Sequence, residues 1–253
     1  MLNLIKAELY KIARRPLYIT ICIIFNLLII LAGIGMHYAF LENSRIPDFS
    51  ALVFITINFM GAIPWIMLMF IDIVLEEYKE NTLKNLISSS ISREKVYLSK
   101  YIVQVIIFLV IEITAVLTMI GTSYALGLVG PNGFSDFMEV ILRLLIAFPI
   151  YISALAIYDF ITIITKKEGL AVVVILGIVS GVPMIFSILS SIYEGIFTLI
   201  YPYLLFNPLK SLVSEVLTTK IIGTNIIVGI INTVVFLILG ILVIRKQWEK
   251  SIR

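Results

Sequence analysis

Residues 57–121 read INFMGAIPWIMLMFIDIVLEEYKENTLKNLISSSISREKVYLSKYIVQVIIFLVIEITAVLTMIG. Two long apolar runs enclose a polar segment, residues 76–100, which carries five basic and four acidic residues. A hydrocarbon core about 30 Å thick needs roughly 20 apolar residues of helix to cross it. Both runs reach that length. The pattern therefore predicts two membrane-spanning helices joined by a charged loop.

The composition of the whole chain agrees with this prediction. Of the 253 residues, 60% are hydrophobic and only 14% are charged, and the mean hydropathy is +1.09. A soluble domain is roughly half apolar and about a quarter charged. We therefore expect an all-α membrane protein. Met1 leads into a charged stretch rather than a short apolar core with a cleavage site, so we expect the first apolar run to be retained.

Apolar runs of sufficient length predict six spans, at 17–38, 51–75, 101–123, 140–164, 169–190 and 222–244. An even number places both termini on one side of the membrane. With both termini in the cytoplasm, 15 of the 19 basic residues lie on the cytoplasmic side, as the positive-inside rule requires. The four exceptions are Arg45, Arg143, Lys210 and Lys220.

Two further segments differ from plain spans. In residues 1–16, Leu2, Ile5, Leu9 and Ile12 recur at helical spacing before Pro16, which predicts an amphipathic helix lying in the membrane interface. The alternative is a basic flank that only sets topology. Residues 191–221 are too apolar for a solvated loop and contain two prolines, so we expect short interfacial or re-entrant helices there, on the extracellular side.

Within the charged loop, Leu83, Leu86, Ile87 and Ile91 recur at helical spacing. This spacing predicts a short amphipathic helix at about 80–90. The nearly balanced charge favours a surface that faces a protein over one that binds anionic lipid. A solvated linker between spans is the alternative interpretation.

The same loop resembles the cytoplasmic loop of the permease subunits of type 2 ATP-binding-cassette exporters. The residues that fall on the family pattern are Glu76, Glu77, Thr82, Leu83, Leu86, Ser92, Arg93 and Lys100, whereas Asn81 replaces a glycine and Ser90 stands near the position of a proline. The resemblance covers essentially residues 1–253 as one transmembrane domain. It implies that residues 76–100 couple the chain to a partner ATPase. The residues expected in that contact are Glu76, Glu77, Thr82, Leu83, Leu86, Ile87, Arg93 and Lys100.

The resemblance also implies the partners. The sequence has no G-x-x-x-x-G-K-[ST] phosphate loop, so ATP and Mg²⁺ would be bound by a separate nucleotide-binding subunit in two copies. A second permease, identical or homologous, would complete the transporter in the bacterial plasma membrane. The short chain resembles permeases of antimicrobial-peptide and lantibiotic immunity and export systems, which implies export of an amphiphilic substrate. Membrane lipids are expected partners, and nucleic acid is not.

Gly177 and Gly181 form a G-x-x-x-G pattern in the fifth span. Small residues at this spacing allow two helix backbones to approach closely in a membrane. Packing within one chain and packing between two permeases both fit the pattern. The resemblance favours the contact between permeases.

Glu112 lies about 16 Å into the third span, near the midplane, where an ionised group is costly. Glu112 is a candidate for the substrate path. Phe59, Met60 and Met119 are further candidates, because their apolar side chains suit an adaptable binding surface. The alternative for Glu112 is a structural hydrogen bond, through Asn26 or Asn58. For the three apolar residues, the alternative interpretation is ordinary packing against other side chains or lipid.

Asp72 and Asp159 lie close to the cytoplasmic ends of their spans, where we expect them to reach headgroups or water in structural roles. Cysteine and histidine each occur once, as Cys22 and His37. A disulfide within the chain, or a metal site built from a pair of either residue, is therefore excluded. No G-x-S-x-G nucleophile motif occurs, which argues against a membrane enzyme. An ion-coupled secondary transporter remains the alternative function, although no internal repeat supports it.

Overall fold

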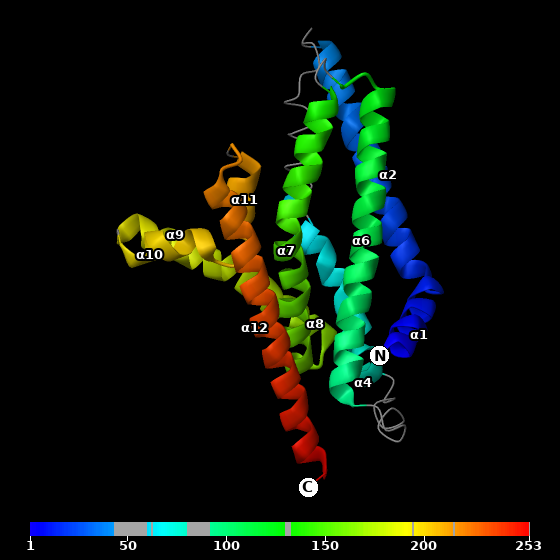
Figure 1. The fold of residues 1–253 in the computed structure, drawn as a ribbon, viewed down its shortest axis with the longest axis vertical. Helices are drawn as coiled ribbons and strands as arrows, with labels where there is room; N and C mark the ends of the chain where they lie inside the picture. The colour runs from blue at the N-terminus through cyan, green and yellow to red at the C-terminus, as the bar shows by residue number, and fades with distance from the viewer. Residues whose placement is uncertain are drawn as a thin grey trace.

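A computed structural model describes residues 1–42, 60–61, 63–79, 92–129, 133–193, 195–214 and 216–252 (Figure 1). Within these ranges the chain contains helices and connecting turns, and no strand. The elements are α1 (Leu2–Ala13), α2 (Pro16–Glu42), η1 (Met67–Phe70), α4 (Ile71–Lys79), α6 (Arg93–Ala125), α7 (Gly133–Thr165), α8 (Glu168–Leu176), η2 (Gly177–Gly181), α9 (Val182–Ile192), α10 (Ile196–Ile200), η3 (Tyr201–Tyr203), α11 (Asn207–Ser214) and α12 (Thr219–Ile252).

Five helical stretches of the described chain are long and apolar enough to cross a membrane. They are Pro16–Ala39, Arg93–Ala125, Gly133–Thr165, Glu168–Ile192 and Thr219–Lys246, and they correspond to five of the six predicted spans. The predicted span at 51–75 lies partly outside the described residues. The structure thus defines a helical protein that passes through the membrane several times.

Helix α7 forms the centre of the bundle. Of its most apolar 18-residue window, 61% is buried, more than in any of the other four candidate spans. Its closest neighbour is α12, because Gly229 allows the two backbones to touch. A Cβ atom at position 229 would lie 2.4 Å from the carbonyl carbon of Pro149 in α7. Such a close approach of small residues is how membrane helices gain packing energy.

The described part of the predicted span at 51–75 is irregular, and neighbouring helices donate hydrogen bonds to it. The 3₁₀ turn η1 precedes α4, and Pro64 lies one turn earlier. Because no water solvates the backbone inside a bilayer, carbonyl groups beside such irregularities need donors from protein. Tyr151 and Tyr158 of α7 donate to the carbonyls of Met60 and Pro64, at 3.4 and 3.0 Å. This span therefore depends on side chains of other helices.

The predicted fifth span, 169–190, is not one continuous α-helix. The π-helical turn η2 divides it into α8 and α9, and α9 runs sideways away from the bundle (Figure 1). No residue of α9 is buried. The following segment forms α10, η3 and α11, so the expectation of short helices within 191–221 agrees with the described residues there.

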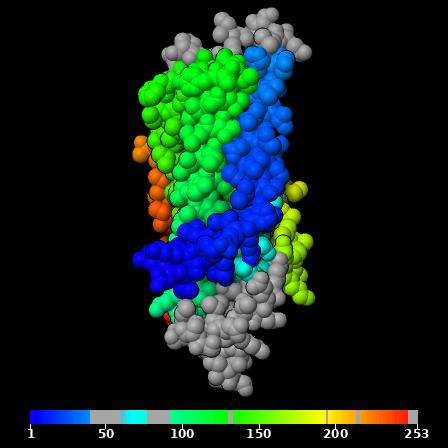
Figure 2. Space-filling model, turned by 90° about the vertical axis from the view of Figure 1, so that its right-hand side faces the viewer, coloured from blue at the N-terminus to red at the C-terminus, as the bar shows by residue number. Residues whose placement is uncertain are grey.

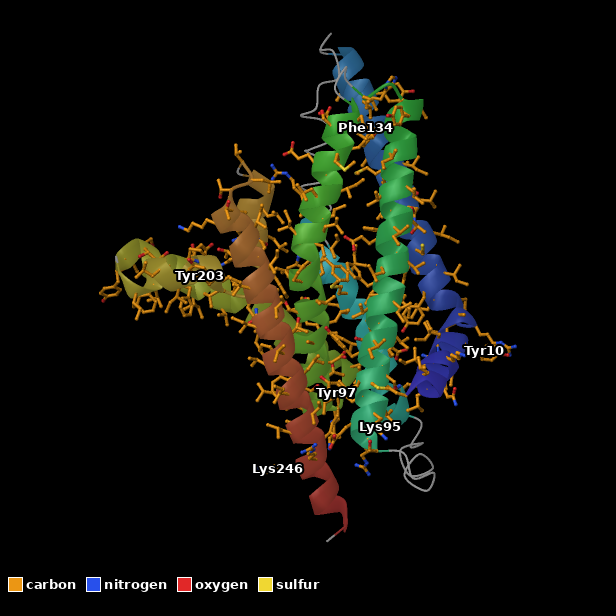
Figure 3. All side chains as sticks on the ribbon, in the orientation of Figure 1. Tyr10, Lys95, Tyr97, Phe134, Tyr203 and Lys246 are labelled. Atoms are coloured by element: carbon orange, nitrogen blue, oxygen red, sulfur yellow. The ribbon has the colours of Figure 1, made fainter. Side chains whose placement is uncertain are left out.

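In Figure 3, the labelled lysines lie at one end of the bundle, toward which Tyr97 and Tyr10 also lie. Lys95 and Lys246 lie at the end that also holds the N-terminal helix, whereas Phe134 lies at the other end (Figure 3). That this end faces the cytoplasm stays a prediction.

Candidate functional site

Helix α1 lies across the lower ends of α2 and α6, as an interfacial helix would (Figure 2). Its apolar face packs inward: Ile12 is buried, and Ile5 and Leu9 pack against the core. Leu2, which the sequence places on the same face, is exposed. Glu8, although charged, is also enclosed, with an exposed fraction of only 6%.

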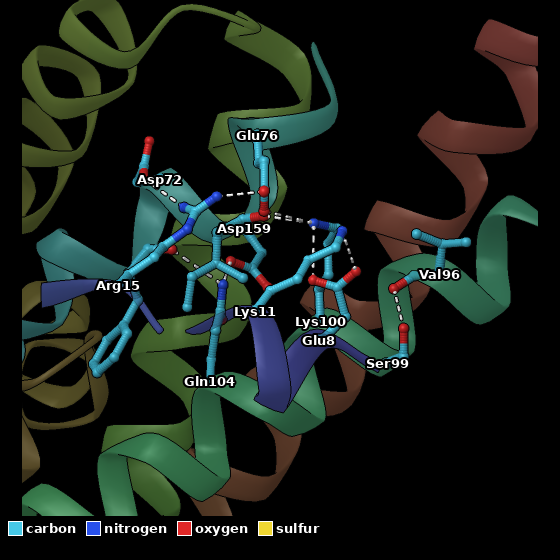
Figure 4. A network of polar contacts seen from close by, with 12 residues as sticks. Glu8, Lys11, Arg15, Asp72, Glu76, Val96, Ser99, Lys100, Gln104 and Asp159 are labelled. Carbon is cyan, nitrogen blue, oxygen red and sulfur yellow. Dashed lines mark hydrogen bonds and ion pairs between the residues drawn. The ribbon is translucent and has the colours of Figure 1, made fainter. Parts of the chain in front are cut away.

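Arg15, just beyond α1, binds two carboxylates of α4. One guanidinium nitrogen lies 3.2 Å from Asp72 Oδ2, and the other pairs with Glu76 (Figure 4). Asp72 and Glu76 are four residues apart and therefore project from the same face of the helix. The planar guanidinium suits such a double contact better than an ammonium group would.

Lys100 of α6 joins the same network from the other side. Its ammonium group donates a hydrogen bond of 2.7 Å to the carbonyl of Ile73 in α4. It also lies 3.6 Å from Glu8 Oε2 and 4.0 Å from Glu76 Oε2. Only 2% of Lys100 is exposed. A single buried cation thus contacts α1 and α4 together.

One turn further along α6, Gln104 extends the polar contacts into the bundle. Its amide nitrogen donates to Asp159 Oδ1 of α7 at 3.0 Å and to the carbonyl of Phe70 at 3.3 Å. Asp159 has an exposed fraction of 1%. The expectation that Asp159 reaches headgroups or water is therefore wrong, because α4, α6 and α7 enclose it.

The ion pairs connect three segments that are distant in the sequence. We name Glu8, Lys11, Arg15, Asp72, Glu76 and Lys100 the α1 ion network; it holds three basic and three acidic side chains, since Lys11 pairs with Glu8 at 3.3 Å. A buried charge that loses its partner destabilises a protein by about 3–5 kcal/mol. The network therefore makes the position of α1 depend on α4 and α6.

The network lies at the two ends of the predicted coupling segment. Helix α4 ends at Lys79 and α6 begins at Arg93, so part of the predicted loop 76–100 is helical. Of the predicted coupling residues, Glu76 and Lys100 are buried in the network, and Arg93 is half-buried. The side chain of Glu77 lies outside the described residues, as do Thr82, Leu83, Leu86 and Ile87 and the amphipathic helix predicted at 80–90.

Two of the residues proposed for the substrate path line one cavity. Glu112 and Met119 line the same narrow apolar cavity between α2, η1 and α6, which has space of about 40 Å³ for water-sized occupants. Met60 is fully buried, and Phe59 lies outside the described residues. Among the described residues Asn26 does not bind Glu112. It accepts a hydrogen bond from Thr118 and donates to the carbonyl of Cys22.

Gly177 and Gly181 mark the first and last residues of η2. A Cβ atom at either position would meet no described atom within 4 Å. Close packing of these two glycines against other helices of the described chain is therefore not observed. The alternative of packing within one chain receives no support from this arrangement.

Sequence reasoning missed Glu8, Arg15 and Gln104 as parts of the site. A signal was present in the spacing, because Asp72 with Glu76 and Lys100 with Gln104 are both i, i+4 pairs at the ends of apolar runs. Glu8 and Arg15 are seven residues apart, which is about two helical turns, although α1 itself ends at Ala13. The spacing could not say which helices would meet.

These features define a class: a helical multi-pass membrane protein in which a buried polar network joins the N-terminal helix α1 to α4 and α6. A protein-family comparison is more specific: the model of the ABC-2 family transporter proteins matches residues 4–184. The chain belongs to this family and is the membrane subunit of an ATP-binding-cassette transporter. The match does not favour the ion-coupled alternative. No curated protein sequence matches the chain.

Proposed function

We propose that the chain is an exporter permease that moves an amphiphilic molecule, such as an antimicrobial peptide, an antibiotic or a lipid-like compound. A separate nucleotide-binding subunit, present in two copies, hydrolyses ATP with Mg²⁺ and drives the movement. A second permease, identical or homologous, completes the complex in the bacterial plasma membrane. Family membership supports the transporter part of this proposal.

The observation that carries the coupling role is the α1 ion network. Helices α4 and α6 flank residues 80–91, and both helices bind α1 through buried charges. A force applied to 80–91 by a partner would reach α4 and α6 first. Because Lys100 and Arg15 tie these helices to α1, the three elements would move together. We assign Glu76 and Lys100 to this linkage, and Leu83 and Ile87 to contact with the ATPase.

The test is co-purification with the partner ATPase. The variant Leu83→Asp/Ile87→Asp places two charges on the apolar face predicted for 80–91, and we expect the ATPase to be lost from the purified complex. A matched control is Leu83→Met/Ile87→Met, which keeps the face apolar and should retain the partner. Recovery of a fully active complex with the aspartate variant would reject the coupling role.

A further inference from the structure

A cavity of about 320 Å³ lies where α1, α2 and α6 meet, within the range of roughly 300–1,000 Å³ that is usual for small-molecule sites. Its walls come from residues within 9–13 of α1, 18–23 of α2 and 106–111 of α6. Helix α1 ends at Ala13 and α2 begins at Pro16, and the chain changes direction between them (Figure 1). The cavity occupies the wedge that the two diverging helices leave beside α6.

The lining of this cavity is apolar. None of the eleven described residues that form it carries a charge, and only Tyr18 and Cys22 have a polar side-chain atom. Cys22 Sγ already lies 3.4 Å from the hydroxyl of Thr114. A polar ligand would give up its hydrogen bonds with water here without replacing them, at a cost of roughly 2–7 kcal/mol per group. The chemistry of the lining therefore selects a hydrocarbon.

The cavity is open on the side that faces the bilayer. Among its lining residues, Ile19, Ile23 and Val110 are exposed, whereas Ile12 and Ile111 are buried. Ile19 and Ile23 lie within about 13 Å of the middle of the candidate span Pro16–Ala39, and therefore inside a hydrocarbon core about 30 Å thick. The hydrocarbon nearest to this opening belongs to the lipid of the membrane.

The course of α1 decides which apolar group can enter. Helix α1 lies across the ends of α2 and α6, so a long straight helix of a second permease laid along these two spans would meet it (Figure 2). A flexible chain can bend into the wedge, and an empty wedge would deprive its lining of van der Waals contacts. We propose that this cavity, which we name the α1 cavity, holds one acyl chain of a membrane phospholipid. The chain packs between α1 and the two spans, in addition to the α1 ion network, and the inference does not rest on the proposed export function.

The test uses the full-length chain in nanodiscs that contain a phosphatidylcholine with a diazirine in one acyl chain. Light converts the diazirine into a carbene that inserts into neighbouring side chains, and mass spectrometry of peptides locates the adducts. We expect residues 18–23 and 106–111 to carry about threefold more adducts than Ile238 and Leu242, exposed residues of α12 outside the cavity, because three walls contact the confined chain. Phosphatidylglycerol with the same chain should give the same pattern, because none of the described lining residues is charged.

Val110→Phe places a ring at the exposed edge of the α1 cavity and should reduce the enrichment to the level of α12. Ile113→Phe changes another exposed residue of α6 that does not line the cavity, and it should leave the enrichment unaltered. If Val110→Phe does not fold, Ala13→Leu narrows the cavity from α1 and should have the same effect. Equal adducts in the cavity and on α12, or an enrichment that survives the narrowed cavity, would overturn the proposal. Adducts confined to α12, as expected if a second permease covers the cavity, would overturn it too.

Discussion

At the scale of single residues, Lys100 is the centre of the polar contacts. It binds the carbonyl of Ile73 and lies within ion-pair distance of Glu8 and Glu76, while almost no part of it reaches solvent. The family pattern and the structure therefore agree that position 100 matters, but they suggest different reasons. The pattern implies contact with a partner, whereas the structure shows contact within the chain.

Replacing Lys100 with methionine should destabilise the protein strongly. The substitution keeps the length of the side chain but leaves Glu8 and Glu76 with fewer cationic partners, at a cost of about 3–5 kcal/mol. We expect a lower midpoint of thermal unfolding in detergent. The control is Lys95→Met on the same helix, which changes an exposed lysine and should have little effect. Equal midpoints for the two variants would contradict a structural role for the network.

A double-mutant cycle separates the pair energy from other effects. Glu8→Gln and Lys100→Gln each leave one buried charge without its partner, whereas the double variant removes both charges. The double variant should therefore lose less stability than the sum of the losses in the two single variants. The coupling energy comes from unfolding midpoints of the four proteins. A coupling energy near zero would show that the ammonium and carboxylate groups, 3.6 Å apart, do not act as a pair.

Individual residues show which features of α1 and its contacts could be predicted from the sequence. The spacing of apolar residues predicted an amphipathic helix in residues 1–16, and α1 turns Ile5, Leu9 and Ile12 toward the core. Its place in the membrane interface stays a prediction. The burial of Glu8 and Asp159 could not be predicted, because it depends on partners distant in the sequence. Arg15 is separated by 57 residues from Asp72 and by 61 from Glu76. Periodicity reports only local neighbours.

At the scale of elements, close contact of α7 with α12 holds the centre of the bundle together. Gly229 and Pro149 touch at backbone level, and Gly240 likewise leaves room for the ring of Tyr97. The runs of apolar residues predicted both α7 and α12 as spans. Their mutual packing was not predicted, since the one small-residue pattern considered, at Gly177 and Gly181, lies elsewhere.

Gly229→Ala should therefore weaken the protein, although alanine is the better helix former. The new methyl group would lie 2.4 Å from the backbone of Pro149, so the helices must separate. Gly223→Ala, in the same helix, meets nothing within 4 Å and should be neutral or stabilising by up to about 1 kcal/mol. Thermal unfolding of both variants gives the comparison. Similar midpoints would mean that α7 and α12 are not in close contact.

The second span offers another prediction at this scale. Tyr158→Phe removes the donor to the Pro64 carbonyl, and an unsatisfied buried acceptor costs about 1–3 kcal/mol. We expect a lower unfolding midpoint and easier proteolysis near Pro64. Tyr10→Phe, which changes an exposed tyrosine of α1, provides the control. Unchanged proteolysis in Tyr158→Phe would mean that the span does not need this bond.

At the scale of the whole molecule, α8, η2 and α9 form the least buried of the five candidate spans in the described chain, with 11% of its most apolar stretch buried. Gly177→Leu/Gly181→Leu places bulk where the described chain offers no neighbour within 4 Å. If a second permease packs there, cross-linking in native membranes should show fewer dimers, while the stability of the single chain stays unchanged. Gly169→Leu on the same span, also without neighbours, is the control. An unaltered dimer fraction would place the permease interface elsewhere.

The distance along the chain between Arg15 and its partners also has a consequence for biosynthesis. At roughly 5–20 residues per second, the ribosome needs roughly 3 to 12 seconds to add the 61 residues between Arg15 and Glu76. Throughout that interval the partner carboxylates of α4 do not yet exist. We expect α1 to stay loosely attached until α4 and α6 have entered the membrane. In a Cys22→Ser background, thiol labelling of Ile12→Cys, a buried position of α1 outside the ion network, should fall abruptly in ribosome-bound chains once α6 emerges. A uniform labelling rate would argue against this late docking.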